Sequence, residues 1–204
     1  MLLAIETAET ACSAALIANG ALVDERHEVV GRGHAERLIP MIAELLGDRR
    51  PETIAVDCGP GSFTGIRVGL AAARGLGLGW NIPVTGFSSM ALLAASAFRH
   101  FSVERLAVVL AGGHGQLFVA RYQRTPFAAL GEAVSLAPAE AAALCGDCNM
   151  VVGSGAQMLA AAANAIPAEQ LVLRASDLRY LDPVFRNLPP RPIYGRAPDA
   201  KPKA

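Results

Sequence analysis

A glycine-rich segment, GPGSFTGIRVGLAAARGLGLG at residues 59–79, contains residue types that could hold a phosphate group or present a nucleophile. A nucleotide-binding P-loop requires the pattern GxxxxGK[ST], because the lysine and the hydroxyl contact the phosphates and magnesium. Counting from Gly59 or Gly61, the second glycine of that pattern falls on Thr64 or Ile66, and no Lys-Ser or Lys-Thr pair follows. The dinucleotide-binding pattern GxGxxG also fails at Thr64. Neither specific nucleotide motif is therefore present.

The serine of this segment, Ser62, lacks the sequence context of a catalytic nucleophile. A nucleophile elbow has the pattern GxSxG, and Gly61-Ser62 is one residue short of it. The chain has only four histidines, and they do not combine convincingly with Ser62 and a carboxylate. We therefore expect Ser62 to be the N-cap of the helix that follows, and we assign no catalytic residue.

Cys145 and Cys148 have the spacing of one half of a zinc site. A structural zinc site needs four ligands, and the sequence has neither a second cysteine pair nor an HxxxH pair. We therefore assign no metal ligand, and a metal or redox role for the two cysteines stays open as the weaker alternative.

Composition and charge narrow the class of protein. The 204 residues are 52% hydrophobic and 18% charged, and 18 basic residues balance 18 acidic ones. A protein that binds a nucleic-acid backbone by itself usually has a basic excess, so we expect no tight independent binding of RNA. The start, MLLAIETAET, has no basic region and carries Glu6, which is unlike a signal peptide. No apolar stretch reaches membrane-spanning length, and we expect a cytoplasmic protein without a membrane segment.

Strands and helices alternate along the chain. Residues 2–29 predict three strands with a hairpin turn at Asn19-Gly20. Helices are expected over 34–46 and 63–74, with a buried strand at 54–56 between them, and the pattern restarts after about residue 100. This alternation predicts an α/β fold in two lobes, residues 1–100 and a smaller lobe of residues 101–204. The proline-rich tail, residues 186–204, is a candidate to pack back on the first lobe.

Two helices of the first lobe have apolar or small residues beyond what one core face needs. On helix 34–46, Ile39 widens the apolar arc to roughly 160°, whereas one core face requires about 100°. Helix 63–74 carries a strip of small residues, namely Gly65, Gly69, Ala72 and Ala73. The strip could pack against the chain's own sheet, or it could let a helix of a partner approach closely. The spare apolar area on the neighbouring helix favours a partner surface with Gly69 at its centre.

The sequence resembles the TsaB (YeaZ) family of bacterial tRNA threonylcarbamoyladenosine biosynthesis proteins. The segment GPGSFTGIRVGLAAARGLG is the most specific point of resemblance. It is supported, in the right order over nearly the whole chain, by LLAIETAETACSAAL, HAERLIPMIAELL, VTGFSSMALLA and PPRPIYGRAPDAKP.

The resemblance implies an actin-like ATPase architecture in two lobes, the second one abbreviated. It also implies a non-catalytic subunit that pairs with the larger paralogue TsaD and the small ATPase TsaE to modify adenosine 37 of tRNAs that read ANN codons. On this reading the chain binds no cofactor alone, an adenine nucleotide can sit at the partner boundary, and tRNA binds through the complex. The family's interface is formed by the helices at 34–46 and 62–78, which here gives the candidate residues His34, Leu38, Met41, Ile42, Leu45, Phe63, Gly65, Ile66, Arg67, Gly69, Leu70 and Ala73.

The chain departs from the family pattern at several places. Glu6 stands where the family usually has an aspartate, and AGGHGQLF replaces a more charged loop. His34 is followed four residues later by Leu38, so the metal-binding HxxxH pair of the catalytic paralogue is missing, and we interpret His34 as a helix-start residue or an interface hydrogen-bonding group. The alternatives left open are a metallopeptidase-like or kinase-like enzyme of the same fold, and a self-associating homodimer.

Overall fold

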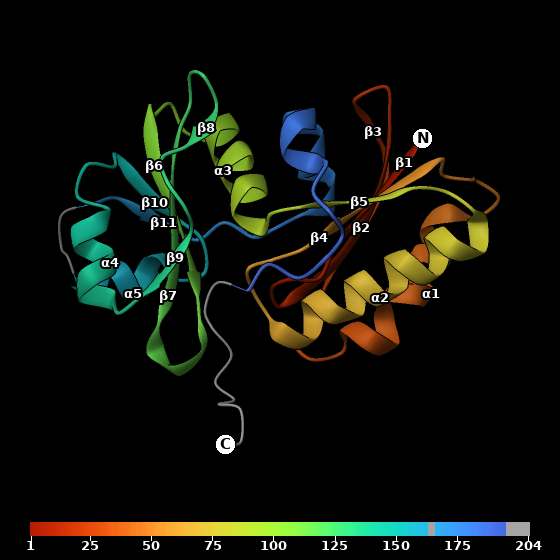
Figure 1. Ribbon diagram of the computed structural model, residues 1–204, viewed down its shortest axis with the longest axis horizontal. Helices are drawn as coiled ribbons and strands as arrows, with labels where there is room; N and C mark the ends of the chain where they lie inside the picture. Colours follow the sequence, from red (N-terminus) through yellow and green to blue (C-terminus); the bar gives the residue numbers. More distant parts are fainter. Residues whose placement is uncertain (163–165, 195–204) are drawn as a thin grey trace, which may run out of the picture.

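The computed structural model describes residues 1–162 and 166–194 as two α/β lobes, each with its own sheet (Figure 1). The α/β prediction is confirmed. In the first sheet the strand order is β3-β2-β1-β4-β5. Its strands are β1 (Leu2–Glu6), β2 (Ala11–Ala18), β3 (Ala21–Val29), β4 (Thr53–Asp57) and β5 (Val84–Phe87).

The first three strands form an antiparallel meander, whereas β1, β4 and β5 run parallel. The predicted hairpin turn is confirmed, because Asn19 and Gly20 join β2 to β3 with φ angles of 50° and 76°. Left-handed backbone at both central turn residues matches the twist of the strands, which is why Asn-Gly is favoured there. The parallel arrangement brings the carboxyl ends of β1 and β4 side by side, at Glu6 and Asp57.

Helices cover both faces of the first sheet. The helices α1 (His34–Leu46) and α2 (Phe63–Trp80) pack on one face, and α3 (Ser89–His100) lies on the other, between the two sheets (Figure 1). The predicted helix 63–74 is too short, since α2 continues through Gly75, Gly77 and Gly79 and ends at an Asn81 cap in left-handed conformation. Three glycines in five residues indicate the end of a helix in the sequence. The contacts of Gly77 with the Ile82–Val84 segment nevertheless hold the last turns of α2 in place.

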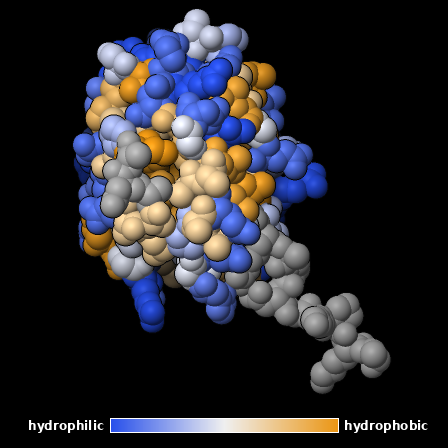
Figure 2. All heavy atoms as spheres, turned by 90° about the vertical axis from the view of Figure 1, so that its left-hand side faces the viewer, coloured by the Kyte–Doolittle hydropathy of each residue, from blue (hydrophilic) through white to orange (hydrophobic). Residues whose placement is uncertain are grey.

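The second lobe has shorter elements. Its sheet has the order β11-β10-β6-β7-β8, with β9 also pairing with β7. The strands are β6 (Arg105–Ala111), β7 (Leu117–Gln123), β8 (Ala128–Ala129), β9 (Val134–Leu136), β10 (Met150–Val152) and β11 (Ala168–Glu169). The helices α4 (Pro138–Leu144) and α5 (Ala156–Ala162) cover its outer side, where apolar residues lie among hydrophilic ones (Figure 2).

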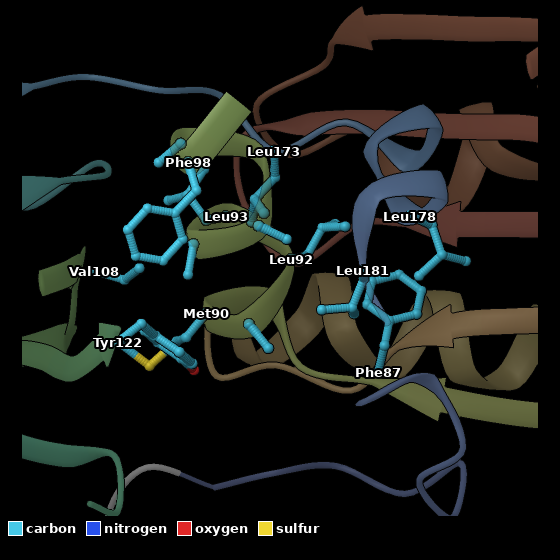
Figure 3. Close-up of a cluster of buried hydrophobic side chains, with 14 of the residues drawn as sticks. Phe87, Met90, Leu92, Leu93, Phe98, Val108, Tyr122, Leu173, Leu178 and Leu181 are labelled. Carbon is cyan, nitrogen blue, oxygen red and sulfur yellow. The ribbon is translucent and has the colours of Figure 1, made fainter. Parts of the chain in front are cut away.

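One hydrophobic core joins the lobes. Side chains of α3 pack on one side against the first sheet, at Phe87, and on the other against β6 and β7, at Val108 and Tyr122 (Figure 3). Three short 3₁₀ turns complete the described chain: η1 (Gly113–Gly115), η2 (Ala175–Tyr180) and η3 (Pro183–Arg186). Of these, η2 packs against α3 and brings Leu178 into the same core (Figure 3).

After η3 the chain runs along the first lobe. Leu188 pairs with Gly86 beside β5, and the Ile193 N–H donates to the Cys58 carbonyl at 2.8 Å. These contacts agree with the expectation that the tail, residues 186–204, packs back on the first lobe; positions 195–204 lie outside the described residues. No helix within the described part of the chain is long and apolar enough to cross a membrane.

Candidate functional site

The glycine-rich segment forms a tight turn between β4 and α2. Gly59 has a φ angle of 95°, which favours glycine, and a Cβ atom on Gly61 would lie 2.2 Å from the Ala8 carbonyl oxygen. The Ser62 side chain accepts a hydrogen bond from the Gly65 N–H at 3.2 Å, so the predicted N-cap is confirmed. This segment is therefore shaped by its contact with the turn after β1.

The small-residue strip of α2 faces the chain's own sheet, and the interpretation of this strip as a partner surface is wrong. Gly65, Gly69 and Ala73 are buried. A Cβ atom would lie 2.0 Å from the Thr7 carbonyl oxygen at Gly65 and 2.4 Å from the Thr7 hydroxyl oxygen at Gly69. The Thr7 hydroxyl also donates to the Gly65 carbonyl at 2.8 Å. The glycines are needed because α2 approaches the end of β1 at backbone-contact distance.

The apolar residues proposed for the interface on α1 and α2 are also internal. They lie in the hydrophobic core between the two helices and the first sheet, where they are at most 5% exposed: Leu38, Met41, Ile42, Leu45, Ile66 and Leu70. A partner cannot contact these side chains in the folded chain. Their helical spacing points these side chains at the first sheet. They therefore support the outer surface of α1 and α2 from beneath.

His34 begins α1, as expected for a helix-start residue. Its imidazole is buried, and Nε2 lies 3.1 Å from the Ala11 carbonyl oxygen of β2. The alternative role as an interface hydrogen-bonding group is corrected by this contact, which ties the helix to its own sheet.

The outer face of α1 and α2 carries a different set of apolar and small residues. Ile39 on α1 is 48% exposed, and Leu78 on α2 is 86% exposed. Ala71 and Gly75 of α2 are also exposed, and a Cβ atom on Gly75 would meet nothing within 4 Å. The sequence signal for this face is the surplus apolar arc at Ile39. Gly75 and Leu78 lie within the helix 62–78 that the resemblance implies, but they are not among the candidate interface residues.

Two of the predicted interface residues do lie on the surface, at the start of α2. Phe63 is 59% exposed, and the Arg67 guanidinium lies 3.4 Å from the centre of its ring. The Arg67 side chain also donates to the Tyr194 hydroxyl at 3.2 Å. A cation over an aromatic ring is held in a fixed position, so Phe63, Arg67 and Tyr194 form an ordered, exposed cluster at one end of the outer face.

Buried carboxyl groups lie at the strand ends beside this turn. The Glu6 Oε1 atom accepts from the Ala8 N–H at 2.6 Å, while Asp57 Oδ1 accepts from the Gly59 N–H and the Ser89 hydroxyl, both at 2.7 Å. Both residues are fully buried, and Glu6 Oε2 and Asp57 Oδ2 have no hydrogen-bond partner.

Burial disfavours the charged form of both carboxyl groups. It raises the pKa of Asp57 to about 7, against the lowering effect of the Ser89 and Gly59 hydrogen bonds. Burial, followed by the nearby Asp57 charge, also raises the pKa of Glu6 well above its ordinary value. Within residues 1–162 and 166–194, no group of three or more His, Cys, Asp or Glu side chains is arranged to hold a metal ion. Both carboxyl groups thus keep a proton to a higher pH than exposed carboxyl groups do.

Cys145 and Cys148 are both buried free thiols at the end of α4. Burial raises the pKa of Cys145 to about 11 and that of Cys148 to about 12. A thiol of this kind is a weak nucleophile at neutral pH, because the thiolate is the reactive form.

Comparisons with known proteins agree with this architecture. Residues 26–175 match the family model described as "TsaD: tRNA N6-adenosine threonylcarbamoyltransferase". A protein of Escherichia coli named "tRNA threonylcarbamoyladenosine biosynthesis protein TsaB" is 36% identical over 128 residues, which are 60% of this chain and 55% of that protein. The protein of the same name from Haemophilus influenzae is 34% identical over 60% of this chain and 54% of its own length. The match thus spans about half the length of these relatives.

Two solved structures resemble nearly the whole chain. "YeaZ from Pseudomonas aeruginosa" is 28% identical, with a TM-score of 0.79 over 95% of this chain and 98% of its own. An uncharacterized protein "with similarity to peptidase YEAZ" from the same organism is also 28% identical, with a TM-score of 0.82 over 96% and 99% of the two chains. The expected actin-like α/β architecture with two sheets is confirmed, and these two structures share it over nearly the whole chain.

Proposed function

The chain belongs to the TsaB (YeaZ) family of tRNA threonylcarbamoyladenosine biosynthesis proteins, and we propose that it is a non-catalytic subunit that binds the paralogue TsaD. The complex so formed transfers a threonylcarbamoyl group to adenosine 37 of tRNAs that read ANN codons. The small ATPase TsaE joins this complex, and tRNA binds to the assembly rather than to this chain alone. The work of such a complex on tRNA would take place in the cytoplasm.

The observation that carries the proposal is the uncovered outer face of α1 and α2. Ile39 and Leu78 expose large apolar side chains there, and Ala71 and Gly75 add small exposed residues on α2. An exposed apolar face on two packed helices is a common feature of protein–protein interfaces. The small residues allow a facing helix to come to the near end of the usual 8–10 Å spacing between axes.

The proposal assigns no bound cofactor to this chain alone. An adenine nucleotide would lie at the boundary with TsaD, which supplies its phosphate and metal ligands. In the absence of TsaD, the same α1–α2 face would form the contact between two copies of this chain in a homodimer. The buried Glu6–Asp57 pair then contributes to the fold rather than to a reaction.

We expect Gly75→Arg to weaken binding of the TsaD paralogue by at least about 30-fold, because central interface positions are commonly worth 2 kcal/mol or more. The isolated subunit should keep or raise its melting temperature, since a Cβ atom at this position meets nothing and glycine disfavours helix by about 1 kcal/mol. Titration calorimetry of the purified pair measures the dissociation constant, and calorimetric melting measures the stability of each subunit.

The matched control is Gln157→Arg, which places the same charge on an exposed position of α5 in the second lobe. It should bind TsaD as the unmodified chain does. An unchanged affinity for Gly75→Arg would rule out the α1–α2 face as the interface. Sedimentation of the subunit alone, with and without Gly75→Arg, tests whether the same face makes the homodimer.

A further inference from the structure

A basic hollow lies at the far end of α3, away from α1 and α2. It has a volume of about 430 Å³ and is formed by the last turns of α3, the turn after β7 and the η2–η3 segment. Figure 1 shows these segments together between the two sheets, on the side where β8 lies. Four arginines line it, one from α3, one from the turn after β7 and two from the η2–η3 segment: Arg99, Arg124, Arg179 and Arg186.

The positive charge of this hollow is not neutralised by ion pairs. Within the described ranges 1–162 and 166–194, none of the four guanidinium groups lies within 4.0 Å of a carboxylate oxygen. Asp182 also lines the hollow, where its Oδ1 atom accepts from the Val184 N–H at 2.9 Å, so one carboxylate stands against four guanidinium groups and the lining keeps an excess of positive charge. Asp177 interacts with Arg179 at longer range; it is buried, it accepts from the Ser96 hydroxyl at 2.8 Å, and burial raises its pKa.

Aromatic rings hold the arginines in place. The guanidinium groups of Arg99 and Arg179 lie 5.3 Å and 4.4 Å from the centre of the Tyr180 ring. Arg124 lies 5.1 Å from the Phe98 ring and donates to the Val103 carbonyl at 2.7 Å. Two cations that share one ring repel each other, so an anion between them would offset a cost already present in the fold.

One arginine nitrogen in this hollow is without a partner. Arg179 Nη2 donates to the Tyr180 hydroxyl at 2.5 Å, whereas Arg179 Nη1 is buried and has no hydrogen-bond acceptor. A buried N–H group of a cation that lacks an acceptor is costly, and such groups are normally paired. The Arg179 guanidinium thus keeps a donor that no group of the described chain uses.

We propose that this hollow binds a small phosphorylated molecule through its phosphate groups. Guanidinium groups suit phosphate because they donate two parallel hydrogen bonds to its oxygens. The volume lies within the range of small-ligand pockets. A single concave site favours a compact anion over an RNA strand, because a backbone needs basic residues spread along its length and the chain has no basic excess.

The test titrates the full chain with inorganic pyrophosphate, ATP and tRNA in turn, at constant ionic strength, and follows binding by calorimetry. Arg99→Gln is the informative variant, because Arg99 is exposed and its side chain donates no hydrogen bond to another of the residues that the structure describes. Arg124 is avoided, since its contact with the Val103 carbonyl supports the chain. Arg50→Gln removes an exposed arginine that does not line the hollow and is the matched control.

We expect pyrophosphate or ATP to bind the unmodified chain and the Arg50→Gln control alike, and to bind Arg99→Gln at least about 10-fold more weakly. The same anion should raise the melting temperature of the unmodified chain more than that of Arg99→Gln. Absence of binding by both anions at millimolar concentration, or equal weakening by Arg50→Gln, overturns the proposal. Binding of tRNA that Arg99→Gln weakens and pyrophosphate does not displace would assign the hollow to RNA and overturn it too.

Discussion

Glu6 and Asp57 lie where two neighbouring parallel strands end, and each has one carboxyl oxygen with no hydrogen-bond donor. In water both oxygens of a carboxylate are solvated, so burying one without a partner is costly. Protonation removes the charge and most of that cost, which explains the raised pKa of both groups. At the scale of single residues, this corner of the fold holds a proton.

Asp57 should make the native chain less stable as the pH rises from about 4 to about 7. Asp57 titrates near 3.8 when unperturbed and near 7 when folded, so in this range the native state keeps a proton that the unfolded chain has released. Asp57 lowers the free energy of unfolding by at most about 1.4 kcal/mol for each unit by which the pH rises. Urea unfolding at a series of pH values measures the free energy of unfolding. Asp57→Asn should remove the fall in this free energy that Asp57 contributes between about pH 4 and about pH 7.

The control for this effect is Glu132→Gln, which removes an exposed carboxylate of the second lobe. It should leave the slope as it is in the unmodified chain. A slope that persists unchanged in Asp57→Asn would show that other groups titrate in this range.

Two glycines of α2 differ in what surrounds them, and their alanine variants should shift stability in opposite directions. Gly65→Ala places a Cβ atom 2.0 Å from the Thr7 carbonyl oxygen and should cost about 1–3 kcal/mol. Gly75→Ala meets nothing and should gain up to about 1 kcal/mol. For a chain of this size each kcal/mol moves the melting temperature by about 2–4 °C, which calorimetry resolves. Equal melting temperatures would contradict the close contact between α2 and the turn after β1.

At the scale of elements, periodicity predicted the strands β1 to β4 and the helix α1, but not the direction in which α2 faces. Alternating strands and the apolar spacing of 34–46 are local signals, and both were read correctly. The small residues Gly65 and Gly69 indicated a close approach, and the sequence could not say whether the neighbour was Thr7 or another chain.

Other features depend on contacts between distant segments and leave no local signal. The helix end at Trp80 depends on the packing of Gly77 against Val84. The basic hollow brings Arg99 together with Arg179 from a turn 80 residues later in the chain, which no motif describes. The carboxyl pair was noted only through Glu6, because its partner Asp57 becomes visible only when β1 and β4 are placed side by side.

At the scale of the whole molecule, the lobes share their core and several polar contacts. The side chains of α3 contact both sheets, and Leu92 is fully buried in this shared cluster (Figure 3). Glu25 of β3 pairs with Arg174 at 2.7 Å, and Glu9 accepts from the Ser154 hydroxyl of the second lobe at 3.1 Å. Domains move independently when little apolar surface joins them. Here the shared apolar core opposes such independence.

We therefore expect the two lobes to unfold in one cooperative transition. Leu92→Ala removes a side chain from the shared core and should cost about 2–5 kcal/mol. Because this core belongs to both lobes, hydrogen exchange should show the same loss of protection in β1 and β4 as in β6 and β7. Trp80 is the single tryptophan and reports on the first lobe, so its fluorescence should change at the same urea concentration as the circular dichroism of the whole chain. A fluorescence midpoint that differs from the dichroism midpoint would show that the lobes unfold separately, and that α3 belongs to one of them alone.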